Sequence, residues 1–297
     1  MVEGSGSIAK RMGISDIVIG LTIVSLGTSA PELLVNIVAS LKGNADIGIG
    51  NILGSNISNI FLILGICALI YPLKIKKNTT WKEIPLNMLA AIVLFLMAND
   101  ILIDKAQNSI LTRIDGLILM IFFIIFMYYT FGLAKAHKEK HNAREKHPMG
   151  KAIAMTIVGI VGLAYGGQWV VDGAIHFAKQ FGLSEALIGL TIVAVGTSLP
   201  ELATSAVAAY KHKTDIAIGN IVGSNLFNIF WVLGLSAVIK PLPFNPMINT
   251  DIMVYFLATV MLFAFCFTKS RYQLDRIEGG IFVVAYIIYI VFLIMRG

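Results

Sequence analysis

The chain has 297 residues, of which 57% are hydrophobic and only 13% are charged. A soluble domain carries about 25% charged residues, so the composition excludes an ordinary soluble protein and predicts an all-helical protein that crosses the lipid bilayer several times. The formal net charge of +6 does not indicate nucleic-acid binding, because the basic residues lie in short loops between apolar runs, where they orient a membrane protein.

Nine apolar runs are long enough to predict membrane-spanning helices. In chain order they cover residues 14–41, 47–71, 84–103, 112–134, 152–176, 183–210, 216–239, 250–268 and 278–295. The first and sixth runs exceed the roughly 20 residues that cross a bilayer, and Pro31 and Pro200 lie near their middles. Because proline removes a backbone donor and clashes with the preceding turn, we expect each of these two runs to break into half-helices.

The first part of the chain recurs in its second half. GLTIVSLGTSAPEL at 20–33 returns as GLTIVAVGTSLPEL at 189–202, and GNILGSNISNIF at 50–61 returns as GNIVGSNLFNIF at 219–230. One constant shift of 169 positions (219 minus 50) relates both pairs. An odd number of predicted spans precedes the second copy, so the two copies enter the membrane from opposite faces. The sequence therefore predicts an inverted repeat of two five-helix halves, with the broken motif helices at the centre.

The predicted halves cover 1–134 and 152–297, joined by a basic linker at 135–151. We expect one helix of the first half to be absent or truncated, because the chain begins with residues that match the end of the span at 152–176. We expect either that the natural start lies further upstream or that the protein lacks this helix. Most of the 23 lysines and arginines fall in alternate loops, which places the linker in the cytoplasm and the C-terminus outside.

Each copy of the motif supplies oxygen ligands of several kinds. The residues are Glu32, Thr28 and Ser29 in the first copy and Glu201, Thr197 and Ser198 in the second. Carboxylates, hydroxyls and the carbonyls freed by a broken turn suit a hard cation such as calcium, which takes roughly six to eight oxygen ligands. An ionised carboxylate inside a membrane costs roughly 2.5–3.5 kcal/mol on insertion scales. A bound cation would offset that cost, whereas the alternative is a kinked helix whose glutamate bonds to neighbouring helices.

A second group of polar residues follows each motif. Ser55 and Asn59 are separated by one helical turn, as are Ser224 and Asn228, so each pair shares a helix face. We expect their neutral oxygens to complete the cation site, although serine and asparagine also form hydrogen bonds between packed helices.

GTSxPE paired with GNxxGSNxxN, present in both halves, resembles the sodium/calcium exchangers of the calcium/cation antiporter superfamily, and in particular a small prokaryotic member. The resemblance implies transport of Ca²⁺ and Na⁺, no catalysis, no cofactor and a location in the prokaryotic cell (inner) membrane. It implies that Glu32 and Glu201 bind both ions, and that the first helix of each half slides across the core. Oxygens of Thr28, Thr197, Ser29, Ser198, Ser55, Ser224, Asn59 and Asn228 would complete the site. We expect the transport unit to be a monomer.

The predicted function is therefore a secondary antiporter that exchanges sodium for calcium by alternating access. Several relatives carry aspartate at the position of Asn228, and the asparagine found here argues against proton coupling. A proton/calcium exchanger of the same superfamily remains the nearest alternative, and its members usually place an acid after the Gly-Asn pair. A cation channel is the alternative from another class, with ligands contributed by several subunits. The sequence contains no nucleotide loop or hydrolase motif, so we do not expect an enzyme.

Overall fold

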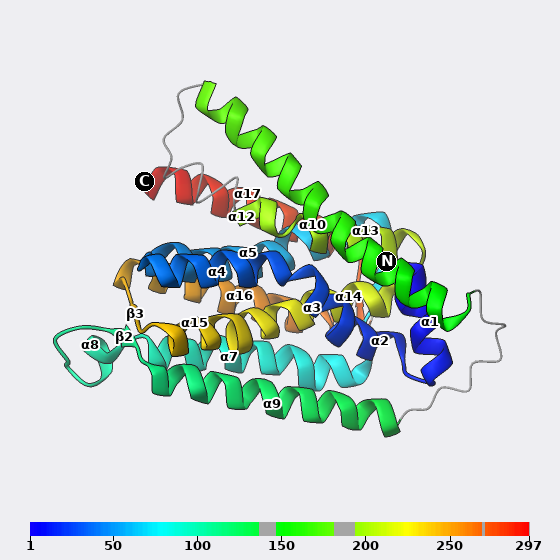
Figure 1. The fold of residues 1–297 in the computed structure, drawn as a ribbon, viewed down its shortest axis with the longest axis horizontal. Coiled ribbons are helices and arrows are strands. Elements are labelled where there is room, and N and C mark those ends of the chain that lie inside the picture. The colour runs from blue at the N-terminus through cyan, green and yellow to red at the C-terminus, as the bar shows by residue number, and fades with distance from the viewer. Residues whose placement is uncertain (137–146, 181–193, 269–270, 297) are drawn as a thin grey trace.

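The computed structural model describes residues 1–136, 147–180, 194–268 and 271–296, which form a bundle of helices (Figure 1). Within these residues, 7 helices are long and apolar enough to cross a membrane, and a bent pair, Asp16–Thr28 with Ala30–Lys42, brings the number to 8 if it is one span. The predicted run at 183–210 lies partly outside the described residues, as does most of the predicted linker. The total of nine spans therefore stays a prediction.

The helices of the first half follow the predicted runs closely, with π-helical turns (labelled η) inserted. They are α1 (Val2–Met12), α2 (Asp16–Ile19), η1 (Gly20–Val24), α3 (Ser25–Thr28), α4 (Ala30–Lys42), α5 (Ala45–Ser58), η2 (Asn59–Leu64), α6 (Gly65–Ile70), η3 (Thr79–Glu83), α7 (Ile84–Met97), α8 (Asp100–Ile103) and α9 (Arg113–Ala136).

The described part of the second half has a similar order, without a counterpart of α8. Its helices are α10 (Met149–Gln180), α12 (Ala194–Thr197), α13 (Leu199–Tyr210), α14 (Thr214–Leu226), η5 (Phe227–Leu233), α15 (Gly234–Ile239), the 3₁₀ turn η6 (Pro246–Ile248), α16 (Asn249–Phe265) and α17 (Arg276–Arg296). Figure 1 shows α10 running obliquely across the bundle, with α1 beside its first part.

The predicted break in the first motif helix is confirmed. The pair Asp16–Thr28 and Ala30–Lys42 bends by 46°, and Ser29 between them has a non-helical ψ of 9°. Pro31 lies in the first turn of α4, where the missing N–H has no partner to lose. Ser198 has nearly the same conformation (φ −85°, ψ 3°) ahead of α13, so in both motifs a new helix begins directly after the serine.

The predicted span at 84–103 is wrong at both ends. The helix runs from Thr79 to Met97, and Asp100–Ile103 forms a separate short helix, α8. Asn99 ends the span because its side-chain Nδ2 donates to the Phe95 carbonyl at 2.8 Å, a local bond that competes with helix continuation. The Asn99 amide also exchanges hydrogen bonds with the Asn249 amide at 2.8 and 2.6 Å.

The all-helical prediction needs one small amendment. Two short antiparallel ladders join loops of the first half to loops of the second: β1 (Leu73–Lys74) pairs with β4 (Gln273–Leu274), and β2 (Ile110–Leu111) pairs with β3 (Leu242–Pro243). Each strand is only two residues long, so no apolar alternation marks it in the sequence.

Glycines let the motif helices of the two halves touch. A Cβ built on Gly219 of α14 would lie 2.8 Å from the Ile17 carbonyl oxygen and 3.0 Å from the Gly20 Cα. A Cβ on Gly223 would lie 2.8 Å from the Leu21 Cα. Close backbone contact through small residues is the typical packing of helices in membranes, and here it sets α14 directly against η1.

An ion pair fixes the end of α17 to the start of α16. Arg296 donates through Nη2 to Asp251 Oδ2 at 3.0 Å and through Nη1 to Oδ1 at 3.3 Å, and Tyr289 Oη donates to the same carboxylate at 2.9 Å.

Replacing Arg296 with glutamine leaves the buried Asp251 carboxylate without its cation, so we expect a loss of about 1–3 kcal/mol of stability. The measurement is the melting temperature of the purified protein in detergent. Arg276→Gln is the matched control, because Arg276 lies exposed at the other end of the same helix. Equal melting temperatures for the two variants would contradict the assigned role of this ion pair.

Candidate functional site

Two glutamates lie at the start of two helices, directly after the two breaks. Glu32 lies in the first turn of α4 and Glu201 in the first turn of α13, and the side chains of both are fully buried. The positive end of a helix dipole stabilises a carboxylate in the first turn. The broken motif helices therefore place one acid from each half inside the protein.

Serine hydroxyls bond to one oxygen of each carboxylate. Ser55 Oγ donates to Glu32 Oε1 at 3.3 Å, and Ser224 Oγ donates to Glu201 Oε1 at 3.4 Å. Ser29 of the first motif also donates to Glu201 Oε1, at 2.9 Å. The Ser198 and Ser55 hydroxyls lie 2.9 Å apart. Each motif serine thus reaches a residue of the other half, which joins the two motifs into one site.

Four asparagines hold the two halves together beside the glutamates. Asn56 Nδ2 donates to the Asn225 carbonyl oxygen at 3.2 Å, and Asn225 Nδ2 donates to the Asn56 carbonyl oxygen at 3.4 Å. Asn59 Nδ2 donates to Asn225 Oδ1 at 2.9 Å, and Asn228 Nδ2 donates to Asn56 Oδ1 at 3.0 Å. Exchanging the halves turns each bond into its partner, because 56 and 225, like 59 and 228, differ by the repeat shift.

Four oxygen atoms of these glutamates and asparagines have no hydrogen-bond partner. In the described part of the chain they are Glu32 Oε2, Glu201 Oε2, Asn59 Oδ1 and Asn228 Oδ1, all fully enclosed. An unpaired buried polar atom is costly, and a buried carboxylate more so. Two carboxylate and two amide oxygens are hard ligands of the kind that calcium and sodium bind. Cation binding would satisfy all four oxygens.

The threonine of each motif donates a hydrogen bond to an asparagine of the other half. Thr28 Oγ1 donates to Asn220 Oδ1 at 3.1 Å, and Thr197 Oγ1 donates to Asn51 Oδ1 at 3.2 Å. Asn220 is itself fixed by its bond to Ser205 Oγ at 3.0 Å. The asparagine of each Gly-Asn pair therefore contacts the threonine of the other half, and this contact helps to fix where the hydroxyl lies.

All ten residues proposed from the sequence are buried, with Thr197 the most exposed at 8%. They are Glu32, Glu201, Thr28, Thr197, Ser29, Ser198, Ser55, Ser224, Asn59 and Asn228. Hydrogen bonds also bring in Asn51, Asn220, Asn56 and Asn225. No cluster of three or more His, Cys, Asp or Glu residues occurs among the described residues, so the two glutamates are flanked by neutral oxygens.

Removing one serine hydroxyl from the candidate site tests this arrangement. Ser55→Ala removes a hydroxyl that contacts Glu32, Ser198 and Asn228, so we expect roughly ten-fold weaker calcium binding, equivalent to about 1.4 kcal/mol. The measurement is equilibrium binding of radioactive calcium to the purified protein. Ser236→Ala is the control, because within the described part of the chain the buried Ser236 hydroxyl bonds only to the Val232 carbonyl one turn earlier, at 2.8 Å. Unchanged calcium affinity in Ser55→Ala would remove Ser55 from the site.

The family model described as sodium/calcium exchanger protein matches residues 1–132 and 151–295. The chain therefore belongs to the sodium/calcium exchanger family, and its relatives are membrane transporters. The inner membrane protein YrbG of Escherichia coli strain K12 is 35% identical over 281 residues, which cover 91% of this chain and 84% of that protein. The sodium/calcium exchanger MaX1 of Methanosarcina acetivorans is 29% identical over 333 residues, covering 98% and 93%. A solved structure of the sodium-calcium exchanger NCX_Mj superposes with a TM-score of 0.83 at 33% identity, over 98% of this chain and 91% of that one.

Proposed function

We propose that this protein is a secondary antiporter that exchanges sodium for calcium across a membrane. The observation that carries the proposal is the set of four buried, unpaired oxygens, two from glutamates and two from asparagines, at the contact between the halves. The ten residues expected from the sequence would form the ion site, with Glu32 and Glu201 shared by both ions.

Sharing these carboxylates makes the binding of calcium and sodium mutually exclusive. One calcium ion, or more than one sodium ion, would neutralise two ionised glutamates, whereas an empty site would leave two like charges close together in a medium of low dielectric constant. The protein would therefore change its access from one side to the other mainly when loaded, and this condition is what converts a binding site into an exchanger.

The arrangement in the membrane follows from the same repeat. We infer nine spans, with halves 1–134 and 152–297 in opposite orientations and the linker 135–151 in the cytoplasm. The reciprocal asparagine bonds support a pseudo-two-fold axis between α5 and α14, because rotation about such an axis would turn each bond into the equivalent bond of the other half. The location would be the prokaryotic inner membrane, with the C-terminus outside.

Radioactive calcium uptake into proteoliposomes preloaded with sodium, potassium or protons tests the coupling ion. We expect rapid uptake with internal sodium, and little uptake with potassium or with a pH gradient alone. The reason is that positions 59 and 228 carry asparagine, whose amide does not titrate, rather than an acid. Uptake driven by a pH gradient without sodium would decide for a proton/calcium exchanger. Single-channel currents far above carrier rates would decide for a cation channel.

A further inference from the structure

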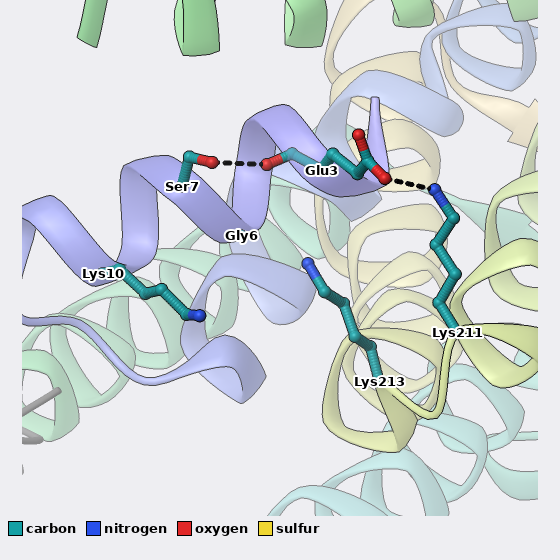
Figure 2. Close-up of a pocket in the computed structure, with 6 residues that line it drawn as sticks. All are labelled: Glu3, Gly6, Ser7, Lys10, Lys211 and Lys213. Atoms are coloured by element: carbon teal, nitrogen blue, oxygen red, sulfur yellow. Dashed lines mark hydrogen bonds and ion pairs between the residues drawn. The ribbon is translucent and has the colours of Figure 1, made fainter. Parts of the chain in front are cut away.

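A pocket of about 400 Å³ lies between α1 and the turn that joins α13 to α14 (Figure 2). Neither Glu32 nor Glu201 lines it. It is lined by Glu3, Gly6, Ser7, Lys10, Lys211 and Lys213. Figure 2 shows the Lys10 and Lys213 side chains extending toward the space between the two elements, with Lys211 beside them.

The pocket has more positive charge than its acids neutralise. Lys211 Nζ forms an ion pair with Glu3 Oε1 at 2.6 Å. Lys213 Nζ donates to the neutral carbonyl of Val2 at 3.2 Å, and burial lowers the Lys213 pKa, with Lys10 and Lys211 adding to that effect and Asp16 and Glu3 opposing it. Lys10 has no ion-pair partner among the residues that the structure describes. Positive charge therefore remains for a ligand to neutralise.

The shape of the pocket brings the ammonium groups close to α1. Gly6 has no side chain, and a Cβ built there would lie 2.4 Å from Lys213 Nζ. The Lys213 side chain occupies the space that this glycine leaves, so its ammonium group lies against α1 rather than in solvent. Two elements distant in the sequence thus present lysines to one cavity.

We propose that this pocket binds a phosphate-bearing anion, either the headgroup of an anionic phospholipid or free phosphate, through Lys10, Lys211 and Lys213. A single phosphate group held by lysines of α1 and of the α13–α14 turn would tie these elements together. Lysines near a membrane surface attract anionic lipids, and the alternating positive loops of this chain place the pocket on the cytoplasmic side. The proposal does not depend on which ions the protein exchanges.

Native mass spectrometry of the purified full chain, titrated with phosphatidylglycerol or phosphatidylcholine, tests the lipid arm. Calorimetric titration with inorganic phosphate tests the soluble arm. We expect Lys10→Gln/Lys213→Gln to weaken phosphatidylglycerol binding about 25-fold, since each lysine contributes roughly five-fold. If phosphate binds and phosphatidylglycerol binds no better than phosphatidylcholine, the ligand is a soluble anion. If phosphatidylglycerol binds better than phosphatidylcholine and phosphate does not bind, the ligand is the lipid headgroup.

Two further variants make the result specific. Lys74→Gln/Lys77→Gln removes the same charge from exposed lysines outside the pocket and should leave anion binding unchanged. Gly6→Ala changes no charge but displaces the Lys213 ammonium, so it should weaken binding several-fold even if the double lysine variant fails to fold. The proposal is overturned if phosphatidylglycerol binds no better than phosphatidylcholine and phosphate does not bind, or if the two double variants lose affinity equally.

Discussion

Glu201→Gln and Glu32→Gln are each expected to reduce sodium-dependent calcium flux by at least about 100-fold. The glutamine amide keeps the size of the side chain and its hydrogen bond to serine, but it removes one of the two charges that balance a divalent ion. In a buried site, where the effective dielectric constant is far below that of water, one lost charge is worth several kcal/mol. The measurement is initial calcium flux in proteoliposomes with an outward sodium gradient.

A matched control separates transport from folding. Asp46→Asn makes the same change of charge at an exposed position in the first turn of α5, and it should transport normally. All three variants should elute as monodisperse protein from a sizing column. Near-normal flux in either glutamate variant would contradict the assigned role of the carboxylates.

Adding methyl groups at the close contact between α14 and η1 should have the second largest effect. In Gly219→Ala/Gly223→Ala, each new Cβ would meet backbone atoms at 2.8 Å, and backbone cannot rotate out of the way. Overpacking costs about 1–3 kcal/mol at each site, so we expect a large fall in melting temperature together with loss of transport. Thermal unfolding in detergent, followed by loss of the monodisperse peak, measures the first effect.

The control for this variant is Gly132→Ala. A Cβ on Gly132 of α9 would meet no other atom within 4 Å, and alanine favours a helix over glycine by up to about 1 kcal/mol. Gly132→Ala should therefore be at least as stable as the starting protein. If the double variant were equally stable, the close contact between the two halves would not exist.

The helices and the two candidate glutamates could be predicted from the sequence because both depend on patterns that recur. The repeat shift relates Glu32 to Glu201 and Ser55 to Ser224, and the proline in each motif predicts the break that the structure shows in the first. Among the described residues, apolar length alone predicted the ends of the spans to within a few residues, except for the span predicted at 84–103. That helix begins earlier, at Thr79, and ends early at Met97, where the Asn99 side chain bonds to the backbone.

The partners within the site could not be predicted, because they depend on contacts between the halves. Nothing in the spacing of Asn56 and Asn225 shows that their amides bond across the repeat, or that the Thr28 hydroxyl faces Asn220. The π-helical turns and the two-residue ladders likewise have no periodic signal. The repeat does mark these positions, since Asn51 and Asn220, like Asn56 and Asn225, lie at the same shift in the two copies.

Competition between the two ions at equilibrium tests the central claim most directly. Binding of radioactive calcium to the purified protein should weaken steeply as sodium is raised, with potassium at the same ionic strength having little effect, and Glu32→Gln should bind calcium poorly at every sodium concentration. Calcium binding that is indifferent to sodium, or that survives in Glu32→Gln, would contradict a shared site built on the two glutamates.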